Sequence, residues 1–553
     1  MLGLVLVGLF DILSNYESNK CEMTYMYEYP EYLPVPLSDN VTMSFPRYNL
    51  YLYAEGRYAR QSANFKLTGV PVLFIPGNAG SHKQVRSLGS VALKKAQHLR
   101  TTFHFNYFAV DLNEELTGMF GAILSEQTEF VHRCILKILS MYRKAEAPPK
   151  SVILVGHSVG GIIARGLFTL PDFDPSMVNT IITQATPHQS PVVNADQYMA
   201  DFYNTVNQFW QDGMSSGRLS HVTIASTGGA HRDYLVRAGL TSLKGIIPET
   251  NAVSAVTSAI PKVWLSTDHL AIVWCKQLVL ATKRALFDII DPKTRQVTTD
   301  VKHRMQVFRH HFLHHPGSKS FSLTSVQSAI PPGDNYQGAR LMYLSLNIPL
   351  PDSEVMKAQG TWFNAMPILF YFFASAICTM VSAALFGGVT MIGHCMVWFG
   401  KKPADPEEMA RKAPHPAALF VISGAFLAVA SQFSGALAFA LVLALYFGKT
   451  CRLYANTITL KNCLNLQNDK KKPGPLADAE DTFHLQYTIL YLIWFMSMLY
   501  MPSVVFWGKN LNFEYRLPAD PALYTAAAMS ACFAFLYPLQ GCNLRKRRSV
   551  TYL

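Results

Sequence analysis

The sequence lacks the short motifs that assign a chain directly to a zinc-binding, disulfide-rich or nucleotide-binding class. Its nine cysteines include no C-x-x-C pair, and only three lie before residue 360. Their spacing therefore predicts neither a disulfide framework nor a zinc site. No Lys-Ser or Lys-Thr pair follows the glycine-rich residues 76–80, which argues against a phosphate-binding loop. The order of strands and helices is left as the main guide to function.

A continuous basic stripe of the kind that binds nucleic acid is also absent. The formal net charge is +12, but toward the C-terminus the Lys and Arg residues stand in short blocks between long apolar runs. Such blocks set the orientation of membrane proteins, so no nucleic-acid partner is expected. Residues 1–13 are apolar apart from Asp11 but lack the basic start of a signal peptide, and they favour a short signal-anchor.

Four apolar runs occupy the C-terminal part of the chain and predict membrane-spanning helices: residues 362–399, 416–447, 485–507 and 522–539. About 20 apolar residues cross a bilayer, so the first run has room for two short crossings, or for one crossing and an interfacial segment. The chain contains one N-x-[ST] acceptor, at Asn40. A glycan there would fit a lumenal domain.

The stretch from Ser151 to Leu170 reads SVILVGHSVGGIIARGLFTL and organises the N-terminal part. An apolar strand leads into a G-x-S-x-G motif centred on Ser158, and Gly160-Gly161 opens a helix. Glycines on both sides permit a turn too tight for side chains, which presents the serine above a sheet and beside a helix N-terminus. An ordinary turn that happens to contain a serine is the alternative. The framing by strand and helix favours a nucleophile.

Short apolar stretches alternate with helical patterns on both sides of this turn. The strand predictions are residues 71–75, 107–111, 151–155, 178–184, 221–227 and 262–267, with helices at 125–142 and 283–317. Continuous apolar strands that alternate with helices predict an α/β fold with a mostly parallel sheet, covered on both faces. Sites in such folds form at the carboxyl ends of the strands.

A serine nucleophile needs a base and an orienting acid, which in α/β-hydrolases follow it along the chain in the order acid, then histidine. Asp233 and His269 each follow a predicted strand, so Ser158, Asp233 and His269 are the predicted catalytic residues. Asp111 also ends a strand and is a rival acid. Asp268 is better suited to cap the helix that begins near Leu270.

Other histidines compete with His269 for the part of the base. His231 precedes the last predicted strand, which is a poor place for it, whereas His157 and His188 are assigned tentatively to the substrate pocket. His310, His311, His314 and His315 have the i, i+4 spacing of a metal site, but no carboxylate stands among them. A basic helix end near a membrane surface is the preferred interpretation there.

Backbone N–H groups should form the oxyanion hole. One is that of Val159, the residue after the nucleophile, and the second comes from the loop after the strand 71–75. Glycines in that loop, Pro76-Gly77-Asn78-Ala79-Gly80, allow a close approach to a ligand. Asn78 or Ala79 is the predicted second donor.

Several motifs carry a resemblance to a known family. They are CEMTYMYEYPEY (Cys21–Tyr32), VLFIPGNAGSHKQVRS (Val72–Ser87), GHSVGGIIAR (Gly156–Arg165), ITQATPHQSPV (Ile182–Val192), GGAHRDYLVRAGLT (Gly228–Thr241), STDHLAIVWCKQL (Ser266–Leu278) and MPSVVFWGKNL (Met501–Leu511). With these motifs the chain resembles the GPI inositol-deacylases of the endoplasmic reticulum, which are membrane-anchored lipases of the α/β-hydrolase class.

The resemblance implies removal of the acyl chain from the inositol of a GPI anchor after the anchor has been attached to protein. The family's serine falls on Ser158, and its R-D-Y and D-H-L patterns fall on Asp233 and His269. It implies GPI-anchored proteins and their lipid anchors as substrates, the lipid bilayer as a partner, and no cofactor or metal. The catalytic domain would be lumenal.

The resemblance and the composition together predict five parts of the chain. They are a short anchor at 1–20, an α/β-hydrolase domain at 21–317, a linker at 318–361, a transmembrane helical region at 362–541 and a basic tail at 542–553. About 45 residues bridge the gap in which the family carries a long β-rich lumenal region, so a short form is expected. Two other functions stay open: a membrane-bound lipase or esterase on phospholipid or acylglycerol, and a non-catalytic scaffold with the hydrolase fold.

Overall fold

A computed structural model describes residues 19–99, 101–192, 197–313, 382–398, 435–466, 474–510 and 513. The described residues fall into two units, one up to residue 313 and one formed by the helices from residue 382 onward. The predicted boundaries at residues 20, 317, 361 and 541 lie outside the described secondary structure or at its edges.

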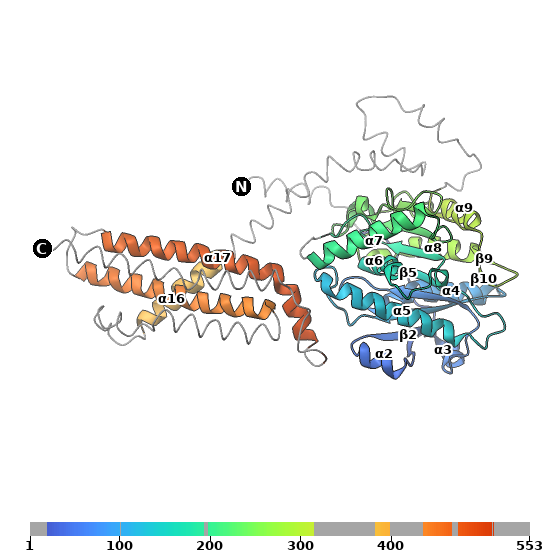
Figure 1. Cartoon of the computed structure of the whole chain (residues 1–553), viewed down its shortest axis with the longest axis horizontal. Coiled ribbons are helices and arrows are strands. Elements are labelled where there is room, and N and C mark those ends of the chain that lie inside the picture. The colour runs from blue at the N-terminus through green and yellow to red at the C-terminus, as the bar shows by residue number, and fades with distance from the viewer. Residues whose placement is uncertain are drawn as a thin grey trace, which may run out of the picture. The chain divides into compact units, whose positions relative to one another are not determined.

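An eight-stranded sheet forms the centre of the first unit (Figure 1), with the order β1-β2-β4-β3-β5-β6-β7-β8. The strands β3 to β8 run parallel, and β1 and β2 are antiparallel to their neighbours. The prediction of a mostly parallel sheet is therefore confirmed. The strands are β1 (Pro30–Pro34), β2 (Asn49–Glu55), β3 (Val70–Ile75), β4 (Phe105–Asp111), β5 (Ile153–His157), β6 (Thr180–Gln184), β7 (Thr223–Gly228) and β8 (Ala252–Val256).

Helices cover both faces of this sheet (Figure 1). One face packs against α4 (Arg86–Leu99), α8 (Lys276–Asp288) and α9 (Val301–Phe312), and the other against α5 (Leu124–Met141), α6 (Val159–Gly166) and α7 (Gln197–Ser215). Two short helices, α2 (Asp39–Ser44) and α3 (Gly56–Ser62), flank β2 in the sequence.

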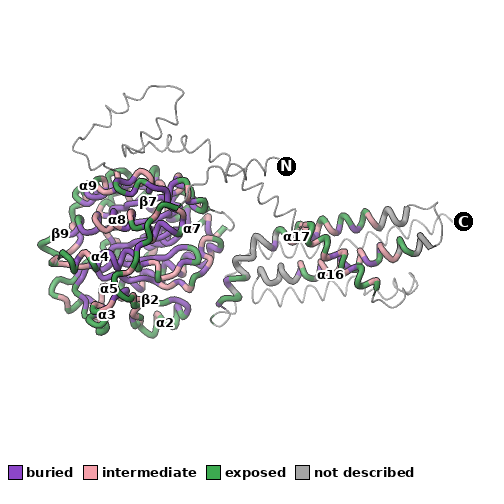
Figure 2. The backbone as a smooth tube through the Cα atoms, turned by 180° about the vertical axis from the view of Figure 1, so that it is seen from behind, coloured by how far each residue is buried: buried purple, intermediate pink, exposed green. Residues whose placement is uncertain are grey.

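Alternate residues of the strands supply the two hydrophobic cores. In β3, Leu73 and Ile75 belong to one core, and Val72 and Phe74 belong to the other. All four are fully buried, and Figure 2 shows the same buried character along the central strands. A strand buried on both faces reads as a continuous apolar run, which is why the sequence revealed these strands.

The structure corrects two of the predicted elements and adds a strand that was not predicted. The stretch 262–267 is not a strand, because Lys262 and Trp264 have φ of 65° and 47°, which extended backbone excludes. The last strand is instead β8, whose small residues Ala252–Val256 give little apolar signal. The predicted helix 283–317 is two helices, α8 and α9, separated by the hairpin of β9 (Ile290–Asp291) and β10 (Gln296–Val297).

The second unit contains α16 (Gly435–Leu466), α17 (Gly474–Lys509) and a helix over residues 382–398. Tyr446 bonds to Gln486, while Lys461, further along α16, pairs with Glu480, earlier in α17, at 3.9 Å. The two long helices are therefore antiparallel. Among the helices that the structure describes, none combines the length and the apolarity needed to cross a bilayer. The predicted span 522–539 lies outside the described residues.

Candidate active site

Ser158 occupies a strained turn between β5 and α6. Its φ of 53° and ψ of −129° are unusual for a residue with a side chain. The flanking glycines make this turn possible, since a Cβ on Gly156 would lie 2.5 Å from Gly161 Cα and a Cβ on Gly160 would lie 2.3 Å from Ile75 O. These are backbone atoms that cannot move aside. The sequence motif thus forms the tight strand-turn-helix that its glycines predicted.

Three side chains from separate parts of the chain meet at this turn. Ser158 Oγ lies 3.0 Å from His269 Nε2, and His269 Nδ1 lies 3.0 Å from Asp233 Oδ2. A carboxylate only accepts hydrogen bonds, so Nδ1 carries the proton and Nε2 is left to accept from the serine hydroxyl. All three side chains are buried, with Asp233 completely so. The sequence order of the three residues predicted this meeting, although His269 lies on a loop and not at the end of a strand.

The backbone holds Asp233 in place. Its Oδ1 accepts from the N–H groups of Leu235 at 3.1 Å and Val236 at 2.8 Å, which leaves Oδ2 for His269. The residue ends a short 3₁₀ turn that follows β7. The rival acid Asp111 is elsewhere: its carboxylate accepts from Asn113 N and lies 3.5 Å from His82 Nδ1.

His157 contacts the predicted base, His269, through its backbone and its ring. Its Nε2 donates to the carbonyl oxygen of His269 at 2.9 Å, and the two ring centroids are 4.9 Å apart. Burial, together with the neighbouring His269, lowers the pKa of His157 to about 3, so this ring is neutral at physiological pH. The side chain was assigned to the substrate pocket from sequence, but its contacts tie the base to the end of β5.

His188 is fully buried as well. Its ring lies 2.9 Å from Thr183 Oγ1 and 3.4 Å from a guanidinium nitrogen of Arg165, itself buried on α6. Burial and the charge of Arg165 hold the pKa of His188 well below its usual range. A fully enclosed ring does not fit the tentative assignment of His188 to the substrate pocket.

The loop after β3 lies against the serine. A Cβ on Gly77 would stand 2.5 Å from Ser158 Cβ, so this glycine permits the close approach. Ala79 N already donates to Glu115 O at 2.8 Å, which leaves Asn78 as the better of the two predicted oxyanion donors. Gly118 N donates to Asn78 Oδ1 at 2.9 Å and fixes that side chain.

A buried polar cluster around Glu115 contacts this loop, and no motif in the sequence predicted it. Glu115 is enclosed, and its carboxylate accepts from Tyr48 Oη at 2.8 Å and from Gln127 Nε2 at 2.9 Å. Arg47 Nε lies 3.4 Å from the same carboxylate. The cluster joins three segments that are separate in the sequence, so no local motif could have revealed it.

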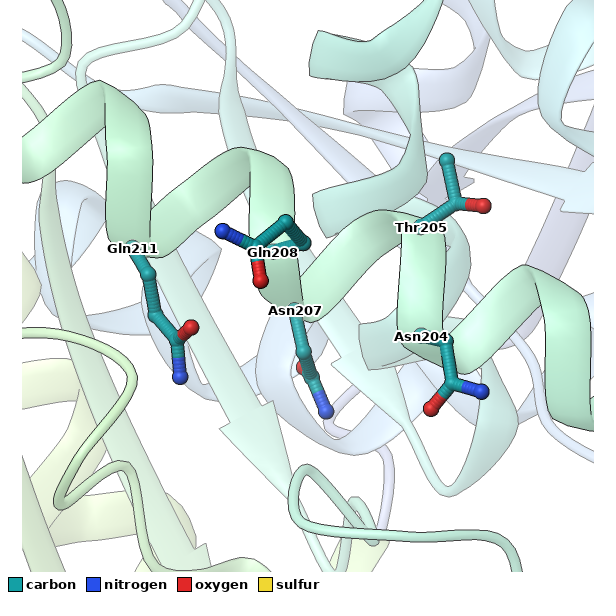
Figure 3. A pocket seen from close by; sticks show the side chains of 5 residues that line it. All are labelled: Asn204, Thr205, Asn207, Gln208 and Gln211. Atoms are coloured by element: carbon teal, nitrogen blue, oxygen red, sulfur yellow. The ribbon is translucent and has the colours of Figure 1, made fainter.

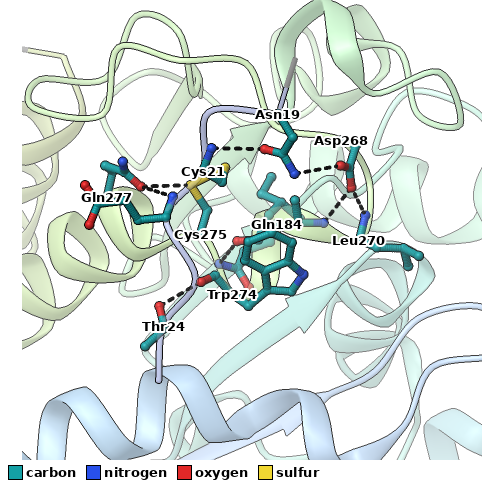
Figure 4. The surroundings of a disulfide bond; sticks show 12 residues. Asn19, Cys21, Thr24, Gln184, Asp268, Leu270, Trp274, Cys275 and Gln277 are labelled. Carbon is teal, nitrogen blue, oxygen red and sulfur yellow. Dashed lines mark hydrogen bonds between the residues drawn. A yellow bond between two sulfur atoms is a disulfide. The ribbon is translucent and has the colours of Figure 1, made fainter. Parts of the chain in front are cut away.

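A disulfide between Cys21 and Cys275 joins residues 254 apart in sequence, although the spacing of the cysteines had predicted no disulfide framework (Figure 4). Around it, Thr24 N donates to Trp274 O at 3.2 Å and Lys276 N to Glu22 O at 2.9 Å. The N-terminal segment is thereby fixed to the end of the loop that carries His269. Two cysteines so far apart form no local pattern, which is why the sequence did not reveal the bond.

The remaining predicted residues have other surroundings. Asp268 Oδ1 accepts from the N–H groups of Leu270 and Ala271, as expected for a cap. His231 Nδ1 lies 2.8 Å from Ser266 Oγ, and Asn40 is exposed on α2. His311 Nε2 lies 2.7 Å from Asp288 Oδ2, and no group of three or more His, Cys, Asp or Glu side chains that could hold a metal ion occurs among the described residues. His314 and His315 lie outside the described residues.

The structure also contains a polar pocket on α7, which Figure 3 shows. Ser158, Asp233 and His269 are not among the residues that line it. It is lined by Asn204, Thr205, Asn207, Gln208 and Gln211. Three of these side-chain amides already donate hydrogen bonds within the protein. Asn207 Nδ2 donates to His188 O, Gln208 Nε2 to Asp212 Oδ1, and Gln211 Nε2 to Gly245 O.

A mostly parallel sheet with a serine on a strained turn after a central strand, followed in the chain by an acid and a histidine, defines the α/β-hydrolase class. Comparison with known proteins narrows this class. Residues 66–289 match the family model of the PGAP1-like alpha/beta domain, and residues 269–521 match that of the GPI inositol-deacylase transmembrane domain.

Proteins named GPI inositol-deacylase are similar to this chain. That of Xenopus laevis is 52% identical over 316 residues, which are 57% of this chain and 34% of the relative. That of Rattus norvegicus is 50% identical over 319 residues, which are 58% of this chain and 34% of the relative. That of Drosophila melanogaster is 40% identical over 312 residues, which are 51% of this chain and 31% of the relative. The chain thus spans about one third of the length of the curated relatives it matches.

Among solved structures, an arylesterase aligns over 55% of this chain and 98% of its own chain, with 9% identity and a TM-score of 0.31. The two family models overlap at residues 269–289 and together cover residues 66–521, and the relatives agree with them. The chain belongs to the GPI inositol-deacylase family and carries that family's transmembrane domain.

Proposed function

We propose that this chain is a serine ester hydrolase that removes the inositol-linked acyl chain from GPI anchors during the maturation of GPI-anchored proteins. The observation that carries the proposal is the line of 3.0 Å contacts from Ser158 through His269 to Asp233. The name of the relatives, GPI inositol-deacylase, supports the choice of ester.

The reaction follows from the site. Ser158 Oγ attacks the acyl carbonyl while His269 Nε2 takes the hydroxyl proton, and Asp233 stabilises the imidazolium that forms. The backbone N–H groups of Val159 and Asn78 hold the oxyanion. His269 then returns its proton to the inositol oxygen as the ester bond breaks. Water, activated by the same histidine, hydrolyses the acyl-serine and frees the fatty acid.

We also propose a location for this reaction: the endoplasmic-reticulum membrane, crossed several times, with residues 21–317 as the lumenal catalytic domain. The disulfide Cys21–Cys275 supports an oxidising compartment. Asn40 is exposed within an N-x-[ST] acceptor, as glycosylation in the lumen requires. The match of residues 269–521 to a transmembrane domain supports the membrane itself. Residues 318–361 would be a linker, 362–541 the membrane region and 542–553 a basic tail.

The nucleophile is tested first, with a fluorophosphonate probe on the purified full chain. The probe should label the wild-type protein, and Ser158→Ala should abolish labelling. Ser176→Ala is the matched control, because Ser176 lies in a short turn before β6 and should leave labelling unchanged. Labelling that survives in Ser158→Ala would contradict the assignment.

The substrate is tested separately, with inositol-acylated GPI and with ordinary phospholipids. Release of fatty acid from the acylated GPI by the wild-type chain, and none by Ser158→Ala, is the expected result. Cleavage of phospholipid alone would replace this substrate with the lipase alternative. Absence of any hydrolysis by a protein that still binds GPI would favour the scaffold.

A further inference from the structure

Four large apolar side chains are exposed on the two segments that carry the acid and the base. Tyr234 and Leu235 directly follow Asp233, Leu270 directly follows His269, and Trp264 lies earlier on the same loop. Their exposed fractions are 62%, 60%, 62% and 49% in that order. We call these four residues the apolar rim.

The two segments are joined at the site. His269 Nδ1 lies 3.0 Å from Asp233 Oδ2, and Thr267 N donates to Gly229 O at 2.9 Å. The backbone beside each exposed leucine is fixed, because Leu235 N donates to Asp233 Oδ1 and Leu270 N to Asp268 Oδ1. The rim is thus a feature of ordered loops at the carboxyl end of the sheet.

Exposure of one apolar side chain is ordinary, whereas several on adjoining segments mark an interaction surface. Elsewhere in the described part of this unit exposed apolar side chains also occur, for example Met43 on α2 and Leu99 at the end of α4. These two stand on separate helices, outside the two segments that carry the acid and the base. They therefore serve as matched controls for the rim.

The composition of the rim fits the interface of a lipid bilayer. Tyr and Trp concentrate at the level of the lipid headgroups, and Lys and Arg favour that region too. Arg237 and Lys262 are exposed on the same two segments. The acidic residues of these segments, Asp233 and Asp268, are occupied by hydrogen bonds within the protein.

The path of the N-terminal chain also favours a lipid bilayer as the partner of the apolar rim. Asn19 Nδ2 donates to Asp268 Oδ2 at 3.3 Å, two residues before Leu270, as Figure 4 shows. Asn19 follows the apolar residues 1–13 by only a few positions. A segment of that composition prefers lipid to water, and the disulfide Cys21–Cys275 holds its point of attachment beside the rim.

We propose that the apolar rim inserts into the interfacial layer of a phospholipid bilayer and admits the membrane-held ester to Ser158. The catalytic unit then takes its substrate from the bilayer, so the acyl chain need not pass through water. This inference rests on the proposed function only in that Ser158 cleaves an ester. It applies to any lipid ester that the chain cleaves.

Two esters with the same leaving group test the rim by activity. The full chain is reconstituted into phosphatidylcholine vesicles and given soluble p-nitrophenyl butyrate, or p-nitrophenyl palmitate held in the vesicles. Trp264→Gln with Leu270→Gln should lower hydrolysis of the palmitate about tenfold or more, since two apolar side chains no longer enter the lipid. Hydrolysis of the butyrate should stay within about twofold of the wild-type rate.

The matched control is Met43→Gln with Leu99→Gln, which should change neither rate. A rim variant that keeps the wild-type ratio of the two rates would overturn the proposal, whether both rates are unchanged or both fall together. Absence of any ester hydrolysis in the wild-type chain would instead contradict the proposed function. Insertion of the rim into lipid is then tested by a second measurement, the quenching of Trp264 fluorescence.

The second measurement locates Trp264 without relying on activity. Brominated phosphatidylcholine quenches tryptophans that contact lipid, so the wild-type chain should lose more emission than Trp264→Phe does in the same vesicles. Equal losses would show that Trp264 does not contact lipid. That result would overturn the proposal.

Discussion

Ser158 and His269 lie 3.0 Å apart, yet the chain holds them by different means. Ser158 is positioned by its sequence neighbours, because the strand, the glycines and the helix within residues 153–166 form the turn between them. His269 lies on an irregular loop that is fixed from a distance, by His157, by Asp233 and by the disulfide that ends at Cys275. The nucleophile is placed by local geometry and the base by tertiary contacts.

This difference has a consequence for how the two halves of the site respond to change. A local turn fails when one residue in it no longer fits, and the failure is complete. A loop held by several distant contacts loses them one at a time, and each loss has a partial effect. The four predictions below separate these behaviours, from the largest effect to the smallest.

Gly156→Val should destroy the turn that presents Ser158. Its Cβ would stand 2.5 Å from Gly161 Cα and 2.6 Å from Gly161 N, both backbone atoms of the same turn, so the turn cannot form. We expect a loss of about 3 kcal/mol or more in the free energy of unfolding and no labelling by fluorophosphonate. Gly448→Ala on α16 is the control, because no atom lies within 4 Å of the place its Cβ would take. Wild-type labelling of the valine variant would contradict this account.

Asp233→Asn should remove most of the activity and leave the fold intact. The Asn oxygen can still accept from Leu235 N and Val236 N, whereas its NH₂ group would face His269 Nδ1 and favour the wrong tautomer. We expect the rate of ester hydrolysis to fall about a thousandfold or more. Asp268→Asn, on the neighbouring capping residue, should keep its rate within about threefold. Similar losses in both variants would count against Asp233 as the orienting acid.

Loss of the disulfide should weaken the base side by degrees. Cys21→Ser with Cys275→Ser frees the N-terminal segment from the loop that carries His269, and we expect a loss of about 2–5 kcal/mol in stability with a smaller loss of activity. Dithiothreitol should lower the melting temperature of the wild-type protein toward that of this variant. The variant itself should not respond to the reductant. A wild-type melting temperature unchanged by reduction would refute the structural part assigned to this bond.

His157→Gln should have the smallest effect, and it should appear mainly in the pH dependence of stability. Burial lowers the pKa of His157 to about 3 in the folded chain, against about 6.5 when unfolded. The unfolded chain binds the extra proton between these values, so this stability is fully present above about pH 6.5 and is lost as the pH falls.

The Gln amide can still donate to the His269 carbonyl, but it does not titrate. The stability lost between pH 7 and pH 5 should therefore be smaller by about 2 kcal/mol in the variant than in the wild-type chain. Urea unfolding of the solubilised protein at the two pH values measures this difference. An equal loss in both proteins would show that His157 does not carry the acid sensitivity.

The difference between local and distant contacts also explains which features could be predicted from the sequence. The parallel strands β3 to β7, the turn at Ser158 and the order of acid and base were predictable, because buried strands are continuous apolar runs and a nucleophile turn needs glycines at fixed positions. The strand β8 was missed because Ala252–Val256 is only weakly apolar, and Lys262–Thr267 was mistaken for a strand because its positive φ angles leave no mark in composition. The disulfide and the Glu115 cluster join distant segments, so no short pattern records them.

The Cys21–Cys275 bond also imposes an order on the synthesis of the protein. Cys21 emerges early, and its partner follows 254 residues later. At about 5–20 residues per second, the first thiol waits on the order of tens of seconds before the second is available. The loop that carries His269 is therefore secured only after nearly the whole sheet has been made. A newly made chain should acquire its nucleophile turn before it acquires its catalytic base.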